Sequence, residues 1–224
     1  MNVQVLITVL FLITFHACAQ NNGENKEDRK DFNDDKKQVA VGDGCEGCAA
    51  VFESPVPFES LGSTDTLPGF NSEEPKIEIS GVVYKSDGKT PAPGVVIYLY
   101  HTDRNGYYSP SAEPQGWEKR HGKNRGWLKT NEKGEYSFLT FRPAPYPNAE
   151  FPAHIHPTIK EPGKTEYWID DFVFDDDKLV NESYREKAEN RGGDGIVTLQ
   201  KNENGIYTAR RDITLGKNIP NYKE

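Results

Sequence analysis

The amino-acid sequence predicts an all-β protein, a β-sandwich with long loops and at most one or two short helices. Fifteen Pro and twenty Gly interrupt the 224-residue chain at short intervals, and aromatic residues are abundant, with eleven Tyr, eleven Phe and three Trp. Both features favour strands and turns over helices. Between the turns lie short runs that are β-branched or alternate between apolar and polar residues, which is the pattern of strands.

Four such runs occupy the first half of the globular part. Residues 77–84 alternate and then become β-branched, whereas residues 95–100 are almost continuously apolar, as in a strand buried on both faces. Residues 127–130 and 135–141 flank an Asn-Glu-Lys-Gly turn. Two strand-like runs around such a turn predict a β-hairpin.

The second half continues the same pattern. Residues 151–159, which are broken by Pro, and residues 167–174 are two further expected strands. Residues 195–200 and 205–215 predict a last hairpin across a polar turn. Residues 179–190 are the one segment expected to form a short helix. Short strands at regular spacing with turns between them are typical of a β-sandwich.

The N-terminus has the pattern of an export signal. Residues 3–15 are apolar apart from three polar residues and are too short to span a bilayer. A small residue before Cys18, at the end of this run, resembles the lipobox of bacterial lipoproteins. We therefore expect a signal peptide over residues 1–17, lipidation of Cys18 and anchoring to a bacterial membrane in the cell envelope. No Lys or Arg precedes the apolar run, so an ordinary secretory signal that releases the protein is the alternative.

Three parts are expected after the signal peptide. Residues 18–43 contain a charged stretch with few apolar residues and predict a disordered tether. Residues 44–75 form a leading segment that contains Cys45 and Cys48. Two Cys are too few for a structural zinc site, and an exported chain meets an oxidising compartment. We therefore expect a disulfide there, rather than a redox-active pair, and the sandwich over residues 76–224.

The pair His154 and His156 is the most informative feature for function. On an extended backbone, residues i and i+2 point to the same face, so both imidazoles can reach one point. Tyr146 precedes the pair and can supply a phenolate oxygen. Two imidazoles with hard oxygen ligands make a site suited to ferric iron. Since a His-x-His pair is also common on solvated strands, the pair alone does not decide between a metal site and a surface feature.

Four stretches of the sequence form a more specific pattern. They are LYHTDRNGYY at 99–108, RGWLKTNEKGEYSF at 125–138, TFRPAPYP at 140–147 and PAHIH at 152–156. In this order and spacing they resemble the motifs of the intradiol ring-cleavage dioxygenases, including the protocatechuate 3,4-dioxygenase-like proteins. The resemblance runs from about residue 78 to residue 215 and covers most of the globular part.

The resemblance implies a mononuclear non-haem Fe(III) cofactor. Its four protein ligands would be Tyr108, Tyr146, His154 and His156, and Tyr107 competes with Tyr108 for the first position. Tyr146 would leave the metal and accept a proton from the substrate, while Tyr108 and the two histidines continue to hold the iron. The implied activity is cleavage of a catechol-type aromatic ring by O2 to a cis,cis-muconate-type product. The partners would be a small aromatic diol and O2.

One position departs from the family pattern. Family members usually have Arg three positions before the first His of the pair, where this chain has Phe151. That cation is thought to stabilise charge on the substrate ring, and a single donor of this kind can be worth about 3–4 kcal/mol of barrier. We expect Phe151 to line the substrate pocket. Arg142, Arg120 and Arg125 are candidates for a replacement cation, and the alternative for each is a surface or turn charge.

Two other functions stay open. Residues 79–136 are also similar to transthyretin-like and carboxypeptidase-regulatory modules, which are binding or structural β-sandwiches and require neither Tyr146 nor the histidine pair. The Phe at position 151 also admits a degenerate dioxygenase that binds iron without turnover. A nucleic-acid partner is not expected, because the net charge is −8 and the pI is about 5.3.

Overall fold

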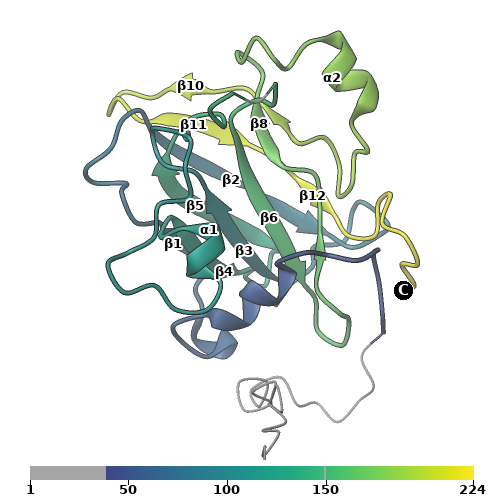
Figure 1. Cartoon of the computed structure of the whole chain (residues 1–224). Coiled ribbons are helices and arrows are strands. Elements are labelled where there is room, and N and C mark those ends of the chain that lie inside the picture. Colours follow the sequence, from purple (N-terminus) through teal and green to yellow (C-terminus); the bar gives the residue numbers. More distant parts are fainter. Residues whose placement is uncertain (1–38, 149) are drawn as a thin grey trace, which may run out of the picture.

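The computed structural model describes residues 39–148 and 150–224, which fold into two packed β-sheets (Figure 1). The predicted all-β architecture with few short helices is confirmed. The predicted signal peptide over residues 1–17, the lipidation site Cys18 and residues 18–38 of the predicted tether lie outside the described residues. Within the described ranges, no helix has both the length and the apolar character needed to cross a membrane.

One layer is the β2 sheet, which we name after its central strand. Its members are β1 (Thr64–Thr66), β2 (Lys76–Tyr84), β5 (Glu135–Phe141), β10 (Gln200–Lys201), β11 (Tyr207–Arg210) and β12 (Ile213–Thr214). The strand order is β1-β5-β2-β11-β10, and β12 also pairs with β2. Burial alternates along β2, where Ile77, Ile79 and Val83 are fully buried. Only one face of this strand enters the core, as its alternating sequence predicts.

The other layer is the β3 sheet. Its members are β3 (Val96–His101), β4 (Arg125–Lys129), β6 (His154–Lys160), β7 (Tyr167–Trp168), β8 (Phe172–Phe174) and β9 (Ile196–Val197). The strand order is β4-β3-β6-β8-β9, and β7 also pairs with β6. β3 and β6 run antiparallel, with Tyr100 opposite His156. This register places the histidine pair beside Tyr100 of β3.

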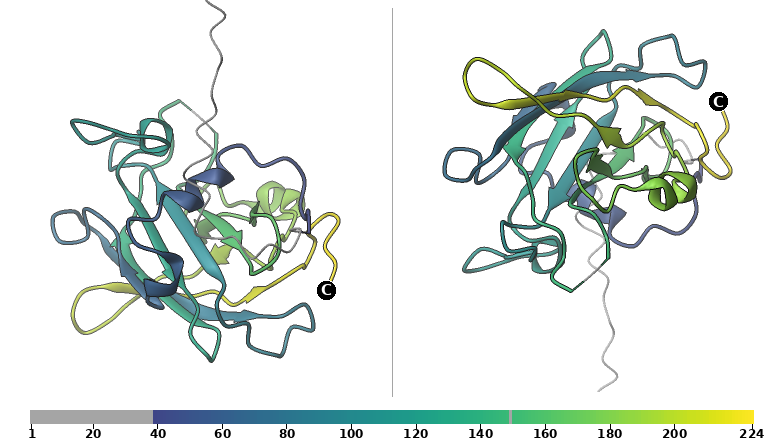
Figure 2. Two further views of the ribbon diagram at one scale, coloured as in Figure 1. Left: turned by 90° about the horizontal axis from the view of Figure 1, so that it is seen from below. Right: turned by 90° about the horizontal axis from the view of Figure 1, so that it is seen from above.

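β3 is buried on both faces because each face meets a different apolar cluster. Leu99 belongs to the main core between the two sheets, together with Phe138 of β5. Tyr98 points the other way and packs in a second cluster with residues of two 3₁₀-helices, η2 (Cys48–Glu53) and η3 (Phe58–Ser60). In Figure 2 the helices of this leading segment, coloured dark blue, lie beside the strands of the sandwich. The segment before the sandwich therefore covers part of the outer face of the β3 sheet.

The first predicted hairpin is wrong. β4 belongs to the β3 sheet and β5 belongs to the β2 sheet, so the turn at residues 131–134 carries the chain from one layer to the other. The last predicted hairpin is correct only between β10 and β11, because β9 pairs in parallel with β8 in the other layer. Alternation predicts a strand with one buried face, but it does not identify the partner strand.

The predicted helix is present and shorter than expected. α2 (Glu182–Lys187) lies inside the predicted range 179–190 and begins where the side chain of Asn181 accepts a hydrogen bond from the amide of Tyr184 (3.1 Å). It ends where Ala188 takes an extended conformation. A second helix, α1 (Glu118–His121), was not predicted, because a four-residue helix is too short to show a periodic pattern.

The sandwich domain begins earlier in the chain than the sequence indicated. Val39 forms a bridge with Lys164, and the amide of Val41 donates to the hydroxyl of Thr165 (3.0 Å). Residues 39–43, which were expected to be tether, are therefore part of the folded domain. β1 lies within the leading segment over 44–75 and pairs in parallel with β5. A short segment that adds to an existing sheet carries too few apolar residues to show a recognisable strand pattern in the sequence.

Candidate metal centre

Four polar side chains from three segments meet at one point. Tyr108 follows the turn after β3, Tyr146 lies on the loop between β5 and β6, and His154 and His156 are on β6. The two hydroxyl groups are hydrogen-bonded to each other, and Tyr108 Oη lies 2.8 Å from His156 Nε2. Tyr146 Oη lies 3.0 Å from His154 Nε2 and 3.3 Å from His156 Nε2. The four residues predicted as a set are therefore brought together by the fold.

The position of β6 in its sheet orients the histidines. Ile155, between them, is fully buried in the main core, so His154 and His156 project from the outer face of the β3 sheet. The ring of Tyr100, opposite His156 in the register, stacks on it with ring centres 4.5 Å apart. The centre thus lies outside the sandwich, on a strand held between β3 and β8.

The two tyrosines are carried by loops that are fastened to each other. The hydroxyl of Thr102 donates to the carbonyl of Ala144 (2.6 Å), and the amide of Ala144 donates to the carbonyl of Asp103 (3.2 Å). Gly106 has a φ of 82°, and a Cβ there would overlap with the carbonyl oxygen of Pro145. Glycine is therefore required for the Tyr108 loop to approach the Tyr146 loop so closely.

Both histidines present Nε2 to the cluster because their Nδ1 atoms are occupied. Nδ1 of His154 lies 2.7 Å from the carbonyl oxygen of Pro152, and Nδ1 of His156 lies 2.9 Å from Oδ1 of Asp171. A carbonyl or a carboxylate only accepts, so each Nδ1 carries the hydrogen and each Nε2 offers a lone pair. Outer partners of this kind orient the histidines of many metal sites.

The carboxylate of Asp171 belongs to the outer shell of the centre. Its oxygen and the ring nitrogens of His154 and His156 lie within 4.8 Å of one another. Oδ1 nevertheless contacts Nδ1 of His156, which points away from the Nε2 atoms that face the tyrosines. Burial alone would raise the pKa of Asp171, but the neighbouring His156, His154 and Arg211 hold that pKa below its usual value. A charged carboxylate behind His156 makes Nε2 a stronger donor to a cation.

The four side chains are arranged better for binding a cation than for hydrogen bonding to one another. Burial, with a contribution from His156, lowers the pKa of His154 to about 4, so its ring is neutral at pH 7. The Nε2 atoms of His154 and His156 lie 3.0 Å apart, and two lone pairs that face each other at this distance repel. Burial also raises the pKa values of Tyr108 and Tyr146. A cation would attract the lone pairs and offset the burial of two phenolates, and imidazole with phenolate oxygen suits Fe(III).

The choice between the two adjacent tyrosines follows from their exposure. Tyr107 is 58% exposed and makes no contact with the cluster, whereas Tyr108 is half-buried within it. Of these two candidates for the first ligand position, the structure places Tyr108 with Tyr146 and the histidines.

The three candidate cations lie in different places. Arg142 forms two hydrogen bonds with Asp176 (2.6 and 2.7 Å) away from the cluster, and Arg125 is bonded to Glu53 (2.7 Å). Arg120, on α1, lines a small pocket of ≈ 230 Å³ together with both tyrosines and His156, and it forms an ion pair with Glu46. Only Arg120 among the three therefore borders the centre.

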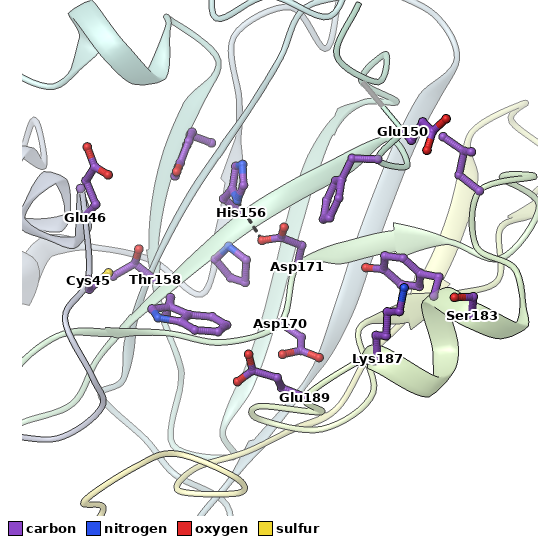
Figure 3. Close-up of a pocket in the computed structure, with 18 of the residues that line it drawn as sticks. Cys45, Glu46, Glu150, His156, Thr158, Asp170, Asp171, Ser183, Lys187 and Glu189 are labelled. Atoms are coloured by element: carbon purple, nitrogen blue, oxygen red, sulfur yellow. Dashed lines mark hydrogen bonds and ion pairs between the residues drawn. The ribbon is translucent and has the colours of Figure 1, made fainter. Parts of the chain in front are cut away.

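A larger cleft of ≈ 800 Å³ opens beside the centre (Figure 3). It shares Glu46, Tyr100 and His156 with the small pocket. Phe151 lines it, and the Phe151 ring lies edge-on to His154 and Tyr184, with ring centres 4.9 and 6.0 Å apart. Arg142 does not line the cleft.

Sequence reasoning missed several residues of this cleft. Asp171 and Trp168 reach it from the β7–β8 region, Tyr184 from α2, and Glu46 from the leading segment. None belongs to a recognisable motif, and their segments are far apart in the chain. The only available signal was the aromatic and acidic composition of residues 167–174.

The predicted disulfide is present and forms part of the cleft wall. Cys45 and Cys48 are bonded, with their Cα atoms 5.5 Å apart, and Cys45 lines the cleft. Cys48 is buried, and the hydroxyl of Thr158 on β6 points to its sulfur (3.7 Å). Between the two cysteines, Gly47 packs against His121. The disulfide therefore holds the Glu46 loop against the sheet that carries the histidines.

Comparison with known proteins gives one family and one fold. The sequence model of a family described as dioxygenase matches residues 61–210. Among solved structures, the chain is similar to 3-chlorocatechol 1,2-dioxygenase from Rhodococcus opacus 1CP, with 22% identity and a TM-score of 0.53, over 68% of this chain and 64% of that chain. It is also similar to catechol 1,2-dioxygenase from Acinetobacter radioresistens, with 17% identity and a TM-score of 0.52, over 68% of this chain and 56% of that chain. The similarity thus spans less than two thirds of either enzyme, and at these identities it shows the shared fold.

Proposed function

The chain belongs to the intradiol dioxygenase family, and on that premise we propose that it is a non-haem Fe(III) dioxygenase. It would cleave a catechol-type ring with O2 to a cis,cis-muconate-type product. The observation that supports this most strongly is the convergence of two phenol oxygens and two imidazole Nε2 atoms within 3.3 Å of their neighbours. The names of the similar structures, catechol and 3-chlorocatechol dioxygenases, also support a catechol-type substrate.

Tyr108, Tyr146, His154 and His156 would hold the iron. When bound, Fe(III) would supply Lewis-acid activation of a chelated catechol toward O2. The histidines are suited to permanent ligation, since a strand fixes their backbone and Pro152 and Asp171 fix their rings.

Tyr146 is suited to a different task. It lies on a loop rather than a strand, is half-buried, and borders the small pocket. A catechol must lose two protons to chelate a metal, and Oη of Tyr146 lies where one of these protons can be accepted. Oη of Tyr108 is within hydrogen-bond distance of Tyr146 and His156. As a phenolate ligand, Tyr108 could accept a hydrogen bond from Tyr146 once Tyr146 has taken up the proton, and so hold it beside the substrate.

A second candidate function is an iron-binding protein without turnover. The observation that favours it is the apolar ring of Phe151 beside His154, at the position where the family usually places a cation. Arg120 would have to supply the missing charge, and its guanidinium is already paired with Glu46. A plain binding module is disfavoured, because such a module has no need of a converging Tyr-Tyr-His-His set.

Two measurements separate these functions. Purified protein loaded with Fe(III) should show a visible tyrosinate-to-iron charge-transfer band, and oxygen uptake should follow addition of a catechol. Tyr146→Phe should weaken and shift the band and abolish uptake, whereas Tyr107→Phe, the matched control, should leave both unchanged. A band without uptake on any catechol would support the degenerate form. A folded protein that binds no iron would overturn the proposal.

We also propose that the protein is exported and attached to a membrane through Cys18. The proposal rests on the apolar run at residues 3–15 and the small residue before Cys18. Metabolic labelling with a radioactive fatty acid in a bacterial host should label the chain, and Cys18→Ser should abolish the label. An unlabelled wild-type chain recovered from the culture medium would instead show ordinary secretion.

A further inference from the structure

We propose that the cleft beside the metal centre accepts catechols whose ring substituent is uncharged or cationic and discriminates against catechols that carry a carboxylate. This inference rests on the proposed function and narrows its substrate class. It follows from what lines the cleft next to the histidines and from where the nearby cations lie.

The wall nearest the centre is aromatic. Phe151 lies edge-on to His154, and Tyr184 of α2 packs against Phe151 from the other side. Trp168 and Tyr100 line the same cleft. A neutral ring substituent gains apolar contact with such a wall. A carboxylate placed against these rings would lose part of its water, and among the described residues that line the cleft Lys187 is the one lysine that could offset this loss.

The charged side chains of the cleft are mostly acidic (Figure 3). Among the described residues that line it, Lys187 is the one lysine and there is no arginine. The carboxylates that line the cleft are Glu46, Glu150, Asp170, Asp171 and Glu189. Glu46 is paired with Arg120, and Asp170 accepts hydrogen bonds from the amides of Asn190 and Arg191. Glu150 has no such partner among the described residues and is exposed at the rim.

Two buried arginines lie behind the cleft but do not serve a ligand. Arg191 is 1% exposed and stacks on Trp168, with its guanidinium carbon 3.4 Å from the ring centre. Arg211 is 3% exposed, donates to the backbone carbonyl of Asp170 (2.7 Å) and lies over Phe172. Both offset part of the negative charge of the acidic residues. Nη1 of Arg191 lies 4.0 Å from the carboxylate of Glu189, and neither arginine is among the residues that line the cleft. A carboxylate taken out of water needs a donor at contact distance.

A cationic substituent meets the opposite conditions. The aromatic rings of Phe151 and Tyr184 attract an ammonium group, as do the carboxylates of Glu150 and Asp171. Oδ1 of Asp171 is engaged by His156, and the side chain keeps 20% of its surface exposed beside the cleft. The cleft therefore favours an ammonium group over a carboxylate through both its aromatic and its acidic residues.

The test compares three catechols that differ only in one ring substituent, each with the iron-loaded protein. The probes are 3,4-dihydroxybenzoate, 4-methylcatechol and 4-(2-aminoethyl)catechol, and oxygen uptake gives kcat/KM for each. We expect the carboxylated probe to be at least tenfold poorer than the methyl probe, and the ammonium probe to equal or exceed the methyl probe. Equal or better turnover of the carboxylated probe would overturn the inference.

Two variants identify the residues responsible. Phe151→Arg should raise the ratio of carboxylated to methyl turnover by tenfold or more, whereas Phe151→Leu should leave the ratio low. Glu150→Lys should raise the ratio about threefold, and Glu203→Lys, which makes the same charge change in the exposed turn between β10 and β11, should not. Unchanged ratios in both Phe151→Arg and Glu150→Lys would contradict the proposed origin of the selectivity.

A binding measurement separates this inference from the proposed function. Calorimetry with 3-hydroxybenzoate and 3-methylphenol, which both lack the two adjacent hydroxyl groups of a catechol, reports the preference of the cleft without turnover. We expect the methylphenol to bind more tightly to the iron-loaded protein by tenfold or more. If no catechol is consumed but this preference holds, the proposed function fails and the cleft selectivity stands. If catechols are consumed but the preference is absent, the inference alone fails.

Discussion

The metal centre and the cleft beside it are neighbours that are built in different ways. His154 and His156 project from one face of a strand that is paired on both sides, and each ring is fixed by an outer partner. The cleft is assembled from α2, the disulfide loop and the segment before β6. If the proposed function holds, metal binding would depend on strand register, whereas substrate choice would depend on loops that can change independently.

Phe151 lies where the two regions meet. It is three residues before His154, so strand β6 positions it, yet its ring faces α2 through Tyr184. A substitution here changes the cleft while the ligand set is kept.

The largest expected effect is at the centre itself. His154→Ala removes one of two Nε2 donors, and we expect iron affinity to fall by more than the roughly 10–100-fold that loss of an outer partner costs. Absorption of the charge-transfer band during iron titration measures this. His121→Gln is the matched control, because His121 bonds to Tyr98 rather than to the cluster. Equal iron affinity in wild type and His154→Ala would contradict the assignment of the centre.

The next effect concerns the sheets that support the centre. His101, on β3, is fully buried, and its Nε2 lies 2.7 Å from the hydroxyl of Thr140 in the other sheet. Burial lowers the pKa of His101 to about 4 from 6.5. Between pH 6.5 and 4, His101 therefore binds a proton in the unfolded chain but not in the folded chain. Stability should fall as the pH drops from 6.5 towards 4, by up to about 3 kcal/mol from this residue.

Urea unfolding of the metal-free protein between pH 4 and 7 measures this dependence. His101→Asn should have a pH slope of unfolding that is smaller by about one proton, whatever its absolute stability. His121 and His154 also have pKa values lowered by burial to about 4, so a residual slope is expected. An unchanged slope in His101→Asn would show that His101 is not the group that titrates.

A smaller effect is expected from the outer partner of His156. Asp171→Ala removes the carboxylate at Nδ1, and we expect iron affinity to fall by roughly 10–100-fold. Asp171→Asn retains an oxygen that can accept from Nδ1 and should recover part of the loss. Asp87→Asn, far from the centre in an exposed turn, is the control. If Asp171→Ala and Asp87→Asn bind iron equally well, the carboxylate does not support the histidine.

The smallest effect should separate the two regions most sharply. Replacing Cys45 and Cys48 by Ser removes a disulfide that closes a very short loop, so the free energy of unfolding should fall by no more than about 2 kcal/mol. The iron site should be retained, because none of its four donors lies on this loop. KM for a catechol should rise several-fold, since Glu46 and Cys45 line the cleft. Loss of iron in this variant would show that the two regions are not independent.

Much of the fold could be predicted because local patterns reflect burial. The alternation of residues 77–84 and the apolar run of residues 95–100 predicted β2 and β3 with the correct extent of burial. The pairing of strands could not be predicted in the same way. The turn after β4 has the composition of a hairpin turn, yet it connects the two layers. β4 pairs with β3 in one sheet, whereas β5 pairs with β2 in the other.

The sequence by itself determined the donors of the candidate centre. A strand fixes His154 and His156 on one face whatever its neighbours are, and the spacing of the motifs selected Tyr108 and Tyr146. Only the tertiary structure decided what surrounds those donors. Asp171, Tyr184 and Glu46 reach the centre or the cleft beside it from segments that are remote in the chain. Their roles depend on distances between elements, which packing sets and no local pattern encodes.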